Sequence, residues 1–295
     1  MADTALTPVQ GIRRELQRSI RGYIAGDDAS RVRALPSDGG WFGPDSITWL
    51  VHTDWSMLVG GIESLLVQVL HPPTMAGVAD HSTYKDDMLG RLQRTGQFLG
   101  TTVFGTAEEA QRSVDIVRSI HDRVTGTTPD GIEYEANDPH NLLWVHATEV
   151  DGFLRAYRRY ASVEITDAEA DRYVAEMAKV GEALGVRRAP RTVQELDDTL
   201  RSYIPELHYG SQARTAMRFL LFPPSRLAAR APYAVLLAAA IDLLPTWARR
   251  KLWIPPTIIP LDVFAVRPAA AALLKTLNWI MEPPEEIEAI RAARN

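Results

Sequence analysis

The stretch DPHNLLWVHATEVD, residues 138–151, carries the strongest folding signal in the chain. Its first two residues are an N-cap aspartate and a proline at the first helical position, a pair that starts a helix. From His140 onward, apolar residues recur every three or four positions, which predicts a helix running to about Tyr160. His146 lies on the apolar face of that helix, so we expect its side chain to be buried.

Three further helix starts carry the capping-box pattern, in which a threonine is followed three residues later by a glutamate. These boxes are Thr106–Glu109, Thr166–Glu169 and Thr192–Glu195. They predict helices that run to about Thr125, Leu184 and Tyr203. Runs of alternating strand residues are absent, and residues 128–136 predict either a hairpin or an irregular loop. The sequence therefore predicts an all-α fold.

The segment Ile47–Leu70 is apolar and contains Gly60 and Gly61. Because glycine weakens a helix, its use here indicates close packing against another element. We expect a single helical domain over residues 1–295. Its C-terminal helical part, residues 206–284, is punctuated by prolines and should consist of short helices joined by sharp turns.

The composition is that of a folded globular chain: of 295 residues, 46% are hydrophobic and 23% are charged. No cysteine occurs, which excludes a disulfide scaffold, a thiolate zinc site and a cysteine nucleophile. The formal net charge of -5 argues against a broadly basic surface for nucleic acid. The motifs of serine hydrolases, P-loop enzymes and dinucleotide-binding enzymes are absent as well.

The sequence also bears on location and assembly. No run of about 18 apolar residues occurs, so we expect no membrane-spanning helix. The first residues lack the apolar run of a signal peptide, which favours the cytoplasm. The apolar helices after Pro223 can pack against one another or against a second subunit in a homo-oligomer, and the sequence leaves both arrangements open.

His121 lies in a predicted helix over residues 108–125, one turn beyond Val117 on the apolar stripe. A histidine on a buried stripe needs partners for its ring nitrogens, because an unpartnered polar group in the interior costs free energy. A hydrogen-bonded core histidine and a ligand of haem or another metal both meet that need. The pattern leaves the two interpretations open.

A second polar feature occurs in the segment 87–99, where Arg91 and Thr95 lie one helical turn apart. Beside a cofactor, the guanidinium could hold a propionate and the hydroxyl could donate to bound oxygen. The alternative is a surface arginine next to a threonine that serves packing or capping.

Two histidine–carboxylate spacings could mark a metal site other than haem. His146 and Glu149 are three residues apart on one helix, although the second such motif of a two-metal bundle is absent. Asp80 could orient a neighbouring histidine, His71 or His81, or it could cap a turn. Without cysteine, any metal ligand must be a His, Asp, Glu, Tyr or Met side chain.

Five stretches occur in the order GGIESLLVQVLHPPTMAGVADHS, LGRLQRT, VFGT, IHDRV and DPHNLLWVHATEVD. Together they resemble the MPAB/Lcp catalytic-domain family, which includes the latex-clearing rubber oxygenases. The resemblance covers about residues 45–205, and the C-terminal part resembles the family only loosely.

This resemblance implies an all-α fold that encloses a b-type haem. It implies His121 as the proximal iron ligand, with Arg91 and Thr95 near the haem. In the rubber oxygenases a lysine precedes that threonine and can occupy the distal side of the iron. Here the residue is Arg94, which offers no lone pair, so we expect an open or water-filled distal position. His146 also departs from the rubber-cleaving branch and is a candidate second ligand, acid–base group or substrate contact.

The resemblance favours a haem b-dependent oxygenase that uses dioxygen on an apolar small molecule. Arg91, Thr95 or His146 would polarise the oxygen, and the haem iron would carry the redox chemistry. Two alternatives stay open. One is a protein that binds haem or an apolar ligand without turnover, and the other is a non-haem metalloprotein that uses His146 and Glu149.

Overall fold

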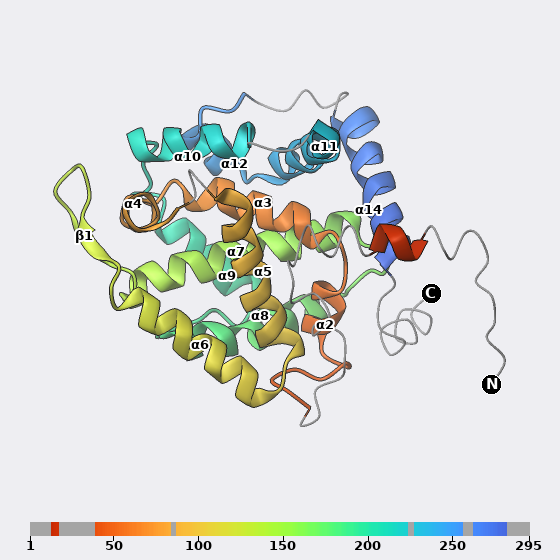
Figure 1. The fold of residues 1–295 in the computed structure, drawn as a ribbon, viewed down its shortest axis with the longest axis horizontal. Coiled ribbons are helices and arrows are strands. Elements are labelled where there is room, and N and C mark those ends of the chain that lie inside the picture. Colours follow the sequence, from red (N-terminus) through yellow and green to blue (C-terminus); the bar gives the residue numbers. More distant parts are fainter. Residues whose placement is uncertain (1–12, 18–38, 84–86, 224–226, 256–261, 282–295) are drawn as a thin grey trace.

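The computed structural model describes residues 13–17, 39–83, 87–223, 227–255 and 262–281. Regular structure in this part of the chain is almost entirely helical, which confirms the all-α fold. Helix α7 (Pro139–Tyr160) runs across the middle of the molecule, and α3 (Met57–Gln68) packs along it (Figure 1).

Helix α7 begins and ends as the sequence predicts. The side chain of Asp138 accepts a hydrogen bond from the backbone N–H of His140, and the last helical residue is Tyr160. Half of the helix, including His146, is buried, because other helices cover it along its length. Its buried side chains include Leu142, Trp144, His146, Val150, Phe153, Leu154 and Tyr157.

Helices α3 and α7 approach each other so closely that both need glycine at the crossing. A Cβ atom on Gly60 would lie 2.6 Å from the carbonyl oxygen of Gly152, and a Cβ atom on Gly152 would lie 2.6 Å from that of Gly60. Two backbones cannot accommodate such a contact without moving apart. The close packing predicted for this segment is therefore confirmed at Gly60.

The apolar segment that contains α3 forms two helices. A shorter helix, α2 (Ile47–His52), comes first, and a turn separates it from α3. In that turn, Oδ1 of Asp54 accepts a hydrogen bond of 2.8 Å from the backbone N–H of Ser56. The turn allows α2 to pack against α8 (Asp167–Leu184) while α3 packs against α7.

All three predicted capping boxes start helices. In α6 (Ala107–His121) and in α8, the threonine and glutamate each bond the other residue's backbone N–H. In α9 (Val193–Ser202), Thr192 accepts from the N–H of Glu195, but the Glu195 carboxylate accepts from the N–H of Arg191. The glutamate thus satisfies a backbone donor one position before the one that the box predicts.

The hairpin predicted as one option for residues 128–136 is present and begins earlier. Thr125–Thr127 forms strand β1, which pairs antiparallel with β2 (Glu133–Glu135). Because these residues enter the hairpin, α6 ends at His121, earlier than predicted. The hairpin projects from the helical body (Figure 1).

The C-terminal helices are α10 (Ser211–Leu221), α11 (Leu227–Leu243), α12 (Thr246–Lys251), a π-helical turn η2 (Asp262–Val266) and α14 (Arg267–Met281). Helices α10, α11 and α12 lie on the side of α3 opposite to α6 (Figure 1). The prediction of short helices is wrong for α11, which has 17 residues and continues through Pro232 at the cost of a backbone hydrogen bond. Among the residues described, no helix is long and apolar enough to cross a membrane.

The glycine contact between α3 and α7 predicts a position-specific loss of stability. We expect Gly60→Ala to lower the free energy of unfolding by about 3 kcal/mol, because the added methyl group meets backbone. Gly61→Ala is the matched control, since a Cβ atom there would lie 3.7 Å from the Phe153 ring. Its effect should stay within about 1 kcal/mol. Urea denaturation measures both, and equal effects would contradict the packing argument.

Candidate functional site

Helix α5 (Met88–Phe104) carries the arginines and the threonine predicted to lie beside a cofactor. Arg91 is half-buried, and the hydroxyl of Thr95, one turn later, donates to the Arg91 carbonyl at 3.2 Å. Arg94 is exposed and forms an ion pair with Asp87, with 3.3 Å between Nη1 and Oδ2. The segment is helical as predicted, which places Arg91 and Thr95 on one face.

His121 is the last residue of α6 and is half-buried. Its Nδ1 atom is buried and makes no hydrogen bond of normal geometry; the Asn137 side chain, whose Oδ1 atom is likewise unpaired, lies nearby. Burial lowers the pKa of His121, while the polar side chain of Asn137 and the charge of Asp122 act to raise it. The ring is therefore neutral at physiological pH and keeps the lone pair that a metal ligand requires.

The apolar stripe predicted for α6 is only partly buried. On this stripe Ala110 and Val114 are fully buried, Val117 is half-buried and Ile120 is 48% exposed. Ile116, which lies off the stripe, is 55% exposed. On the neighbouring helix α5, Leu92 is 42% exposed. Exposed aliphatic side chains therefore occur on both of these adjoining helices.

Helices α5 and α6 are joined through Gly105 and pack against each other. Figure 1 shows them meeting at this connection and separating toward their other ends. Arg91 lies near the free end of α5, and His121 lies at the free end of α6. The residues predicted to hold haem are thus carried by one pair of diverging helices.

His146 is buried in the contact between α7 and α8, with 6% of the residue exposed. A Cβ atom on Gly181 of α8 would lie 3.0 Å from three atoms of the His146 ring, so glycine makes room for the imidazole. The Nε2 atom has no hydrogen-bond partner, and burial lowers the pKa of His146 to about 4. The predicted burial of His146 is confirmed.

Glu149, the residue paired with His146 in the non-haem hypothesis, interacts with Tyr173 of α8. Burial raises the pKa of Glu149 to about 7. Burial, followed by the charge of Glu149, raises the pKa of Tyr173, whose hydroxyl lies 3.2 Å from Nε2 of His52. Within the described part of the chain, no third histidine or carboxylate joins His146 and Glu149 within reach of one ion.

A buried acidic pair beside the crossing of α3 and α7 was not predicted from the sequence. Glu63 is 1% exposed, and its Oε1 atom has no hydrogen-bond partner. Burial, together with the charge of Asp151, raises the pKa of Glu63 well above its ordinary value. Arg155 partly offsets this charge, because its Nε donates to Oδ2 of Asp151 at 2.6 Å. In the sequence, the one indication of this pair is Glu63 itself, a single glutamate within the apolar segment Ile47–Leu70.

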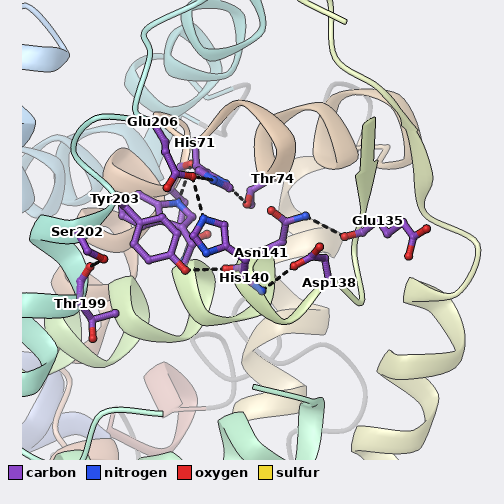
Figure 2. A network of polar contacts seen from close by, with 12 residues as sticks. His71, Thr74, Glu135, Asp138, His140, Asn141, Thr199, Ser202, Tyr203 and Glu206 are labelled. Atoms are coloured by element: carbon purple, nitrogen blue, oxygen red, sulfur yellow. Dashed lines mark hydrogen bonds and ion pairs between the residues drawn. The ribbon is translucent and has the colours of Figure 1, made fainter. Parts of the chain in front are cut away.

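Three side chains from distant parts of the chain converge at the start of α7 (Figure 2). His71 precedes α4 (Pro72–His81), His140 lies in the first turn of α7, and Glu206 lies in the turn after α9. The Oε2 atom of Glu206 is 2.8 Å from Nε2 of His140 and 3.7 Å from Nε2 of His71. Two imidazoles and a carboxylate form a donor set suited to a transition metal.

Burial and aromatic packing shape this His71–His140–Glu206 cluster. Burial lowers the pKa of His71 to about 4, against the opposing charge of Glu206. The ring of Tyr203 stacks on that of His140, with centroids 4.4 Å apart, and its hydroxyl donates to the His140 carbonyl. Sequence reasoning singled out His71 alone, because His140 and Glu206 are 66 residues apart and form no local motif.

Asp80 bonds to residues other than the neighbouring histidines. Its Oδ2 accepts from the Tyr134 hydroxyl at 2.8 Å, and its Oδ1 accepts from Nε2 of Gln212 at 3.3 Å. The Nε2 atom of His81 lies 3.1 Å from the carbonyl oxygen of Thr125. Asp80 therefore links α4 to β2 and α10, and the structure does not use it to orient a ligand.

An open cavity of about 420 Å³ lies beside the turn that carries Glu206. It is lined by Ile204, Leu207, His208, Tyr209, Trp247, Arg250, Lys251 and Trp253. Trp253 is 72% exposed and has a φ angle of 58°, a left-handed conformation that is uncommon for a bulky residue. No lining residue belongs to α5 or α6, so this cavity differs from the cofactor pocket that the sequence predicts.

The neutral, buried state of His146 predicts a pH-dependent stability. Because burial lowers its pKa from 6.5 to about 4, the folded chain binds fewer protons than the unfolded chain between these values. The contribution of neutral His146 to the free energy of unfolding is complete above pH 6.5 and is lost as the pH falls toward 4. We expect the free energy of unfolding of the wild type, relative to His146→Leu, to fall by roughly 3 kcal/mol between pH 7 and pH 4.

Urea titrations across this range measure the difference. Protonation of Glu149 changes the free energy of unfolding in the opposite direction. Because Glu149 is present in both proteins, its effect cancels in the difference between them. His81→Leu, which removes an exposed histidine, is the control and should follow the wild type. Parallel stability curves for the wild type and His146→Leu would show that His146 is not held neutral by burial.

Comparison with known protein families identifies the chain. The family model described as "ER-bound oxygenase mpaB/B'/Rubber oxygenase, catalytic domain" matches residues 49–276. No curated protein and no solved structure shows a significant match. The family match includes helices α5, α6 and α7 and continues through the C-terminal helices into α14, where the sequence resembled the family only loosely. The chain therefore belongs to the family of mpaB and rubber oxygenase catalytic domains.

Proposed function

We propose that the protein is a haem b-dependent oxygenase that uses dioxygen to oxidise an apolar small molecule. Membership of an oxygenase family supports the reaction class. The observation that most directly supports the cofactor is the His121 ring, whose buried Nδ1 atom makes no hydrogen bond of normal geometry. An unsatisfied buried ring nitrogen costs free energy, and a histidine that acts as an iron ligand gains a strong interaction in return.

Helices α5 and α6 expose aliphatic side chains that a flat, largely apolar group would cover. Leu92, Ile116 and Ile120 expose aliphatic surface on α5 and α6. A porphyrin would cover surface of this kind, which is otherwise costly to leave in water. His121 is half-buried at the end of α6, whereas His146 is enclosed between α7 and α8.

Two residues of α5 interact with polar groups in this proposal: Arg91 binds a haem propionate, and Thr95 donates a hydrogen bond to dioxygen. A guanidinium binds a carboxylate bidentately, so Arg91 suits a propionate. The Thr95 hydroxyl bonds to its own helix at 3.2 Å, and a rotation about χ1 would release it as a donor to dioxygen. Bound haem would supply the iron that activates dioxygen.

In this proposal the distal side of the haem iron is open, because Arg94 does not bind the iron. Arginine stays protonated and has no lone pair, so it cannot take the place of the lysine found in the rubber oxygenases. Its guanidinium is exposed and paired with Asp87. We infer that His146 has a positioning role, since its ring packs against Gly181 and holds α7 on α8.

The test is the haem content of the purified protein, measured by absorption spectroscopy and the pyridine haemochrome assay after expression with a haem precursor. The wild type should carry b-type haem near one equivalent. His121→Ala should bind haem at least about tenfold more weakly, because an iron ligand is lost. Added imidazole should restore part of the Soret band.

Two control variants make this test specific. His81→Ala removes an exposed histidine, and His146→Ala removes a buried one outside the proposed pocket, so both should retain haem. A His121→Ala protein with the wild-type spectrum would disprove the ligand assignment, and a wild type that stays colourless with added hemin would disprove the proposal. Haem binding without oxygen uptake in the presence of reductant and apolar substrates would favour a carrier over an oxygenase.

A further inference from the structure

The His71–His140–Glu206 cluster lies outside the proposed haem site, because none of its members belongs to α5 or α6. The 2.8 Å contact between His140 and Glu206 is a hydrogen bond. The 3.7 Å separation between Nε2 of His71 and Oε2 of Glu206 is too long for one. The Nε2 atom of His71 thus faces a carboxylate oxygen at ion-pair distance, beyond the length of a hydrogen bond.

The geometry of metal coordination accounts for these separations. Ligand atoms about 2.1 Å from a tetrahedral zinc ion lie about 3.4 Å from one another. The two separations from Oε2 of Glu206, 2.8 Å to His140 and 3.7 Å to His71, bracket that value. One ligand atom of each residue lies within 4.8 Å of the other two. Since the side chains of His140 and Glu206 are 51% and 46% exposed, small rotations can equalise the spacing.

We propose that His71, His140 and Glu206 bind a divalent transition-metal ion, each residue supplying one ligand atom. Two histidines and one carboxylate are the protein ligands of several zinc enzymes and of non-haem Fe(II) oxygenases. Nitrogen and oxygen donors of this kind suit Zn2+, Fe2+ and Co2+ better than soft ions such as Cu+. Three protein ligands leave at least one coordination position for water or a substrate.

The orientation of the His71 ring is fixed before any ion binds. Its Nδ1 atom lies 2.8 Å from the hydroxyl oxygen of Thr74, in the first turn of α4 (Figure 2). The rings of Trp144 and Tyr203 pack around it, each with its centroid 5.7 Å away. A metal-bound histidine characteristically uses its second nitrogen in such a contact, which holds the ligating nitrogen in place.

Hydrogen bonds to backbone carbonyls hold the segments of the cluster together. The Tyr203 hydroxyl donates to the carbonyl of His140 at 2.8 Å. The N–H of His208 donates to the carbonyl of Leu70 at 2.7 Å, which ties the turn bearing Glu206 to the residue before His71. Sites positioned by such supporting contacts lose less entropy when they bind a ligand.

The test is a titration of the untagged full-length protein with Co2+ after treatment with a chelator. Co2+ in a site of few nitrogen and oxygen ligands gives visible d–d bands, and Zn2+ should displace it with loss of those bands. We expect about one ion per chain. His140→Ala and Glu206→Gln should each weaken binding by at least about tenfold.

The matched control is His208→Ala, which removes an exposed histidine two residues from Glu206 and should bind Co2+ as the wild type does. Because His140 and Glu206 are both half-exposed, their variants should keep the wild-type circular dichroism and thermal unfolding in the absence of metal. This comparison separates loss of the site from loss of the fold. His71→Ala is a weaker probe, since His71 is 1% exposed and its removal leaves a cavity.

The result is independent of the haem proposal. His121→Ala should bind Co2+ like the wild type, and His140→Ala should bind haem like the wild type. A wild type that gives no d–d bands would overturn the metal site. Equal Co2+ binding by the wild type, His140→Ala and Glu206→Gln would overturn it as well, because the ion would then lie elsewhere.

Discussion

Contact between the backbones of α3 and α7 is the constraint on which the rest of the molecule depends. Gly60 and Gly152 allow the two helices to meet without side chains between them. Helix α7 then positions two other features, since its first turn carries His140 and its middle packs on α8 through His146. Protein interiors are densely packed, so a change in the α3–α7 spacing would be transmitted to both.

Around this contact, burial determines the chemistry of the ionisable groups. Burial lowers the pKa of His52 to about 3 and that of His146 to about 4, and it raises the pKa of Glu63. These side chains are enclosed and contribute to the core as neutral or charge-compensated groups. His121 and His140 differ, because each remains partly accessible to solvent. His71 is as buried as the structural histidines, so what marks it as a ligand candidate is the nearby carboxylate of Glu206.

Local signals in the sequence predict much of the fold. The Asp138 cap defined α7, the threonine–glutamate boxes defined three helix starts, and the apolar spacing predicted the burial of His146. The apolar spacing made His121 one candidate ligand among others, and the family resemblance favoured it as the proximal one. The His71–His140–Glu206 cluster could not be predicted, because tertiary packing alone brings its three segments together. The end of α6 was also missed, since pairing with a later strand decides it.

The β1–β2 hairpin has a consequence for how the chain can be altered. Residues 129–133 at its tip are exposed, and the tip closes on itself through Thr128, whose backbone bonds those of Gly131 and Ile132. Gly131 takes a φ angle of 84°, which glycine adopts without strain. A break or an inserted domain at this tip would leave the helices on either side intact. The hairpin is therefore the natural place to open the chain for circular permutation or to attach a reporter domain.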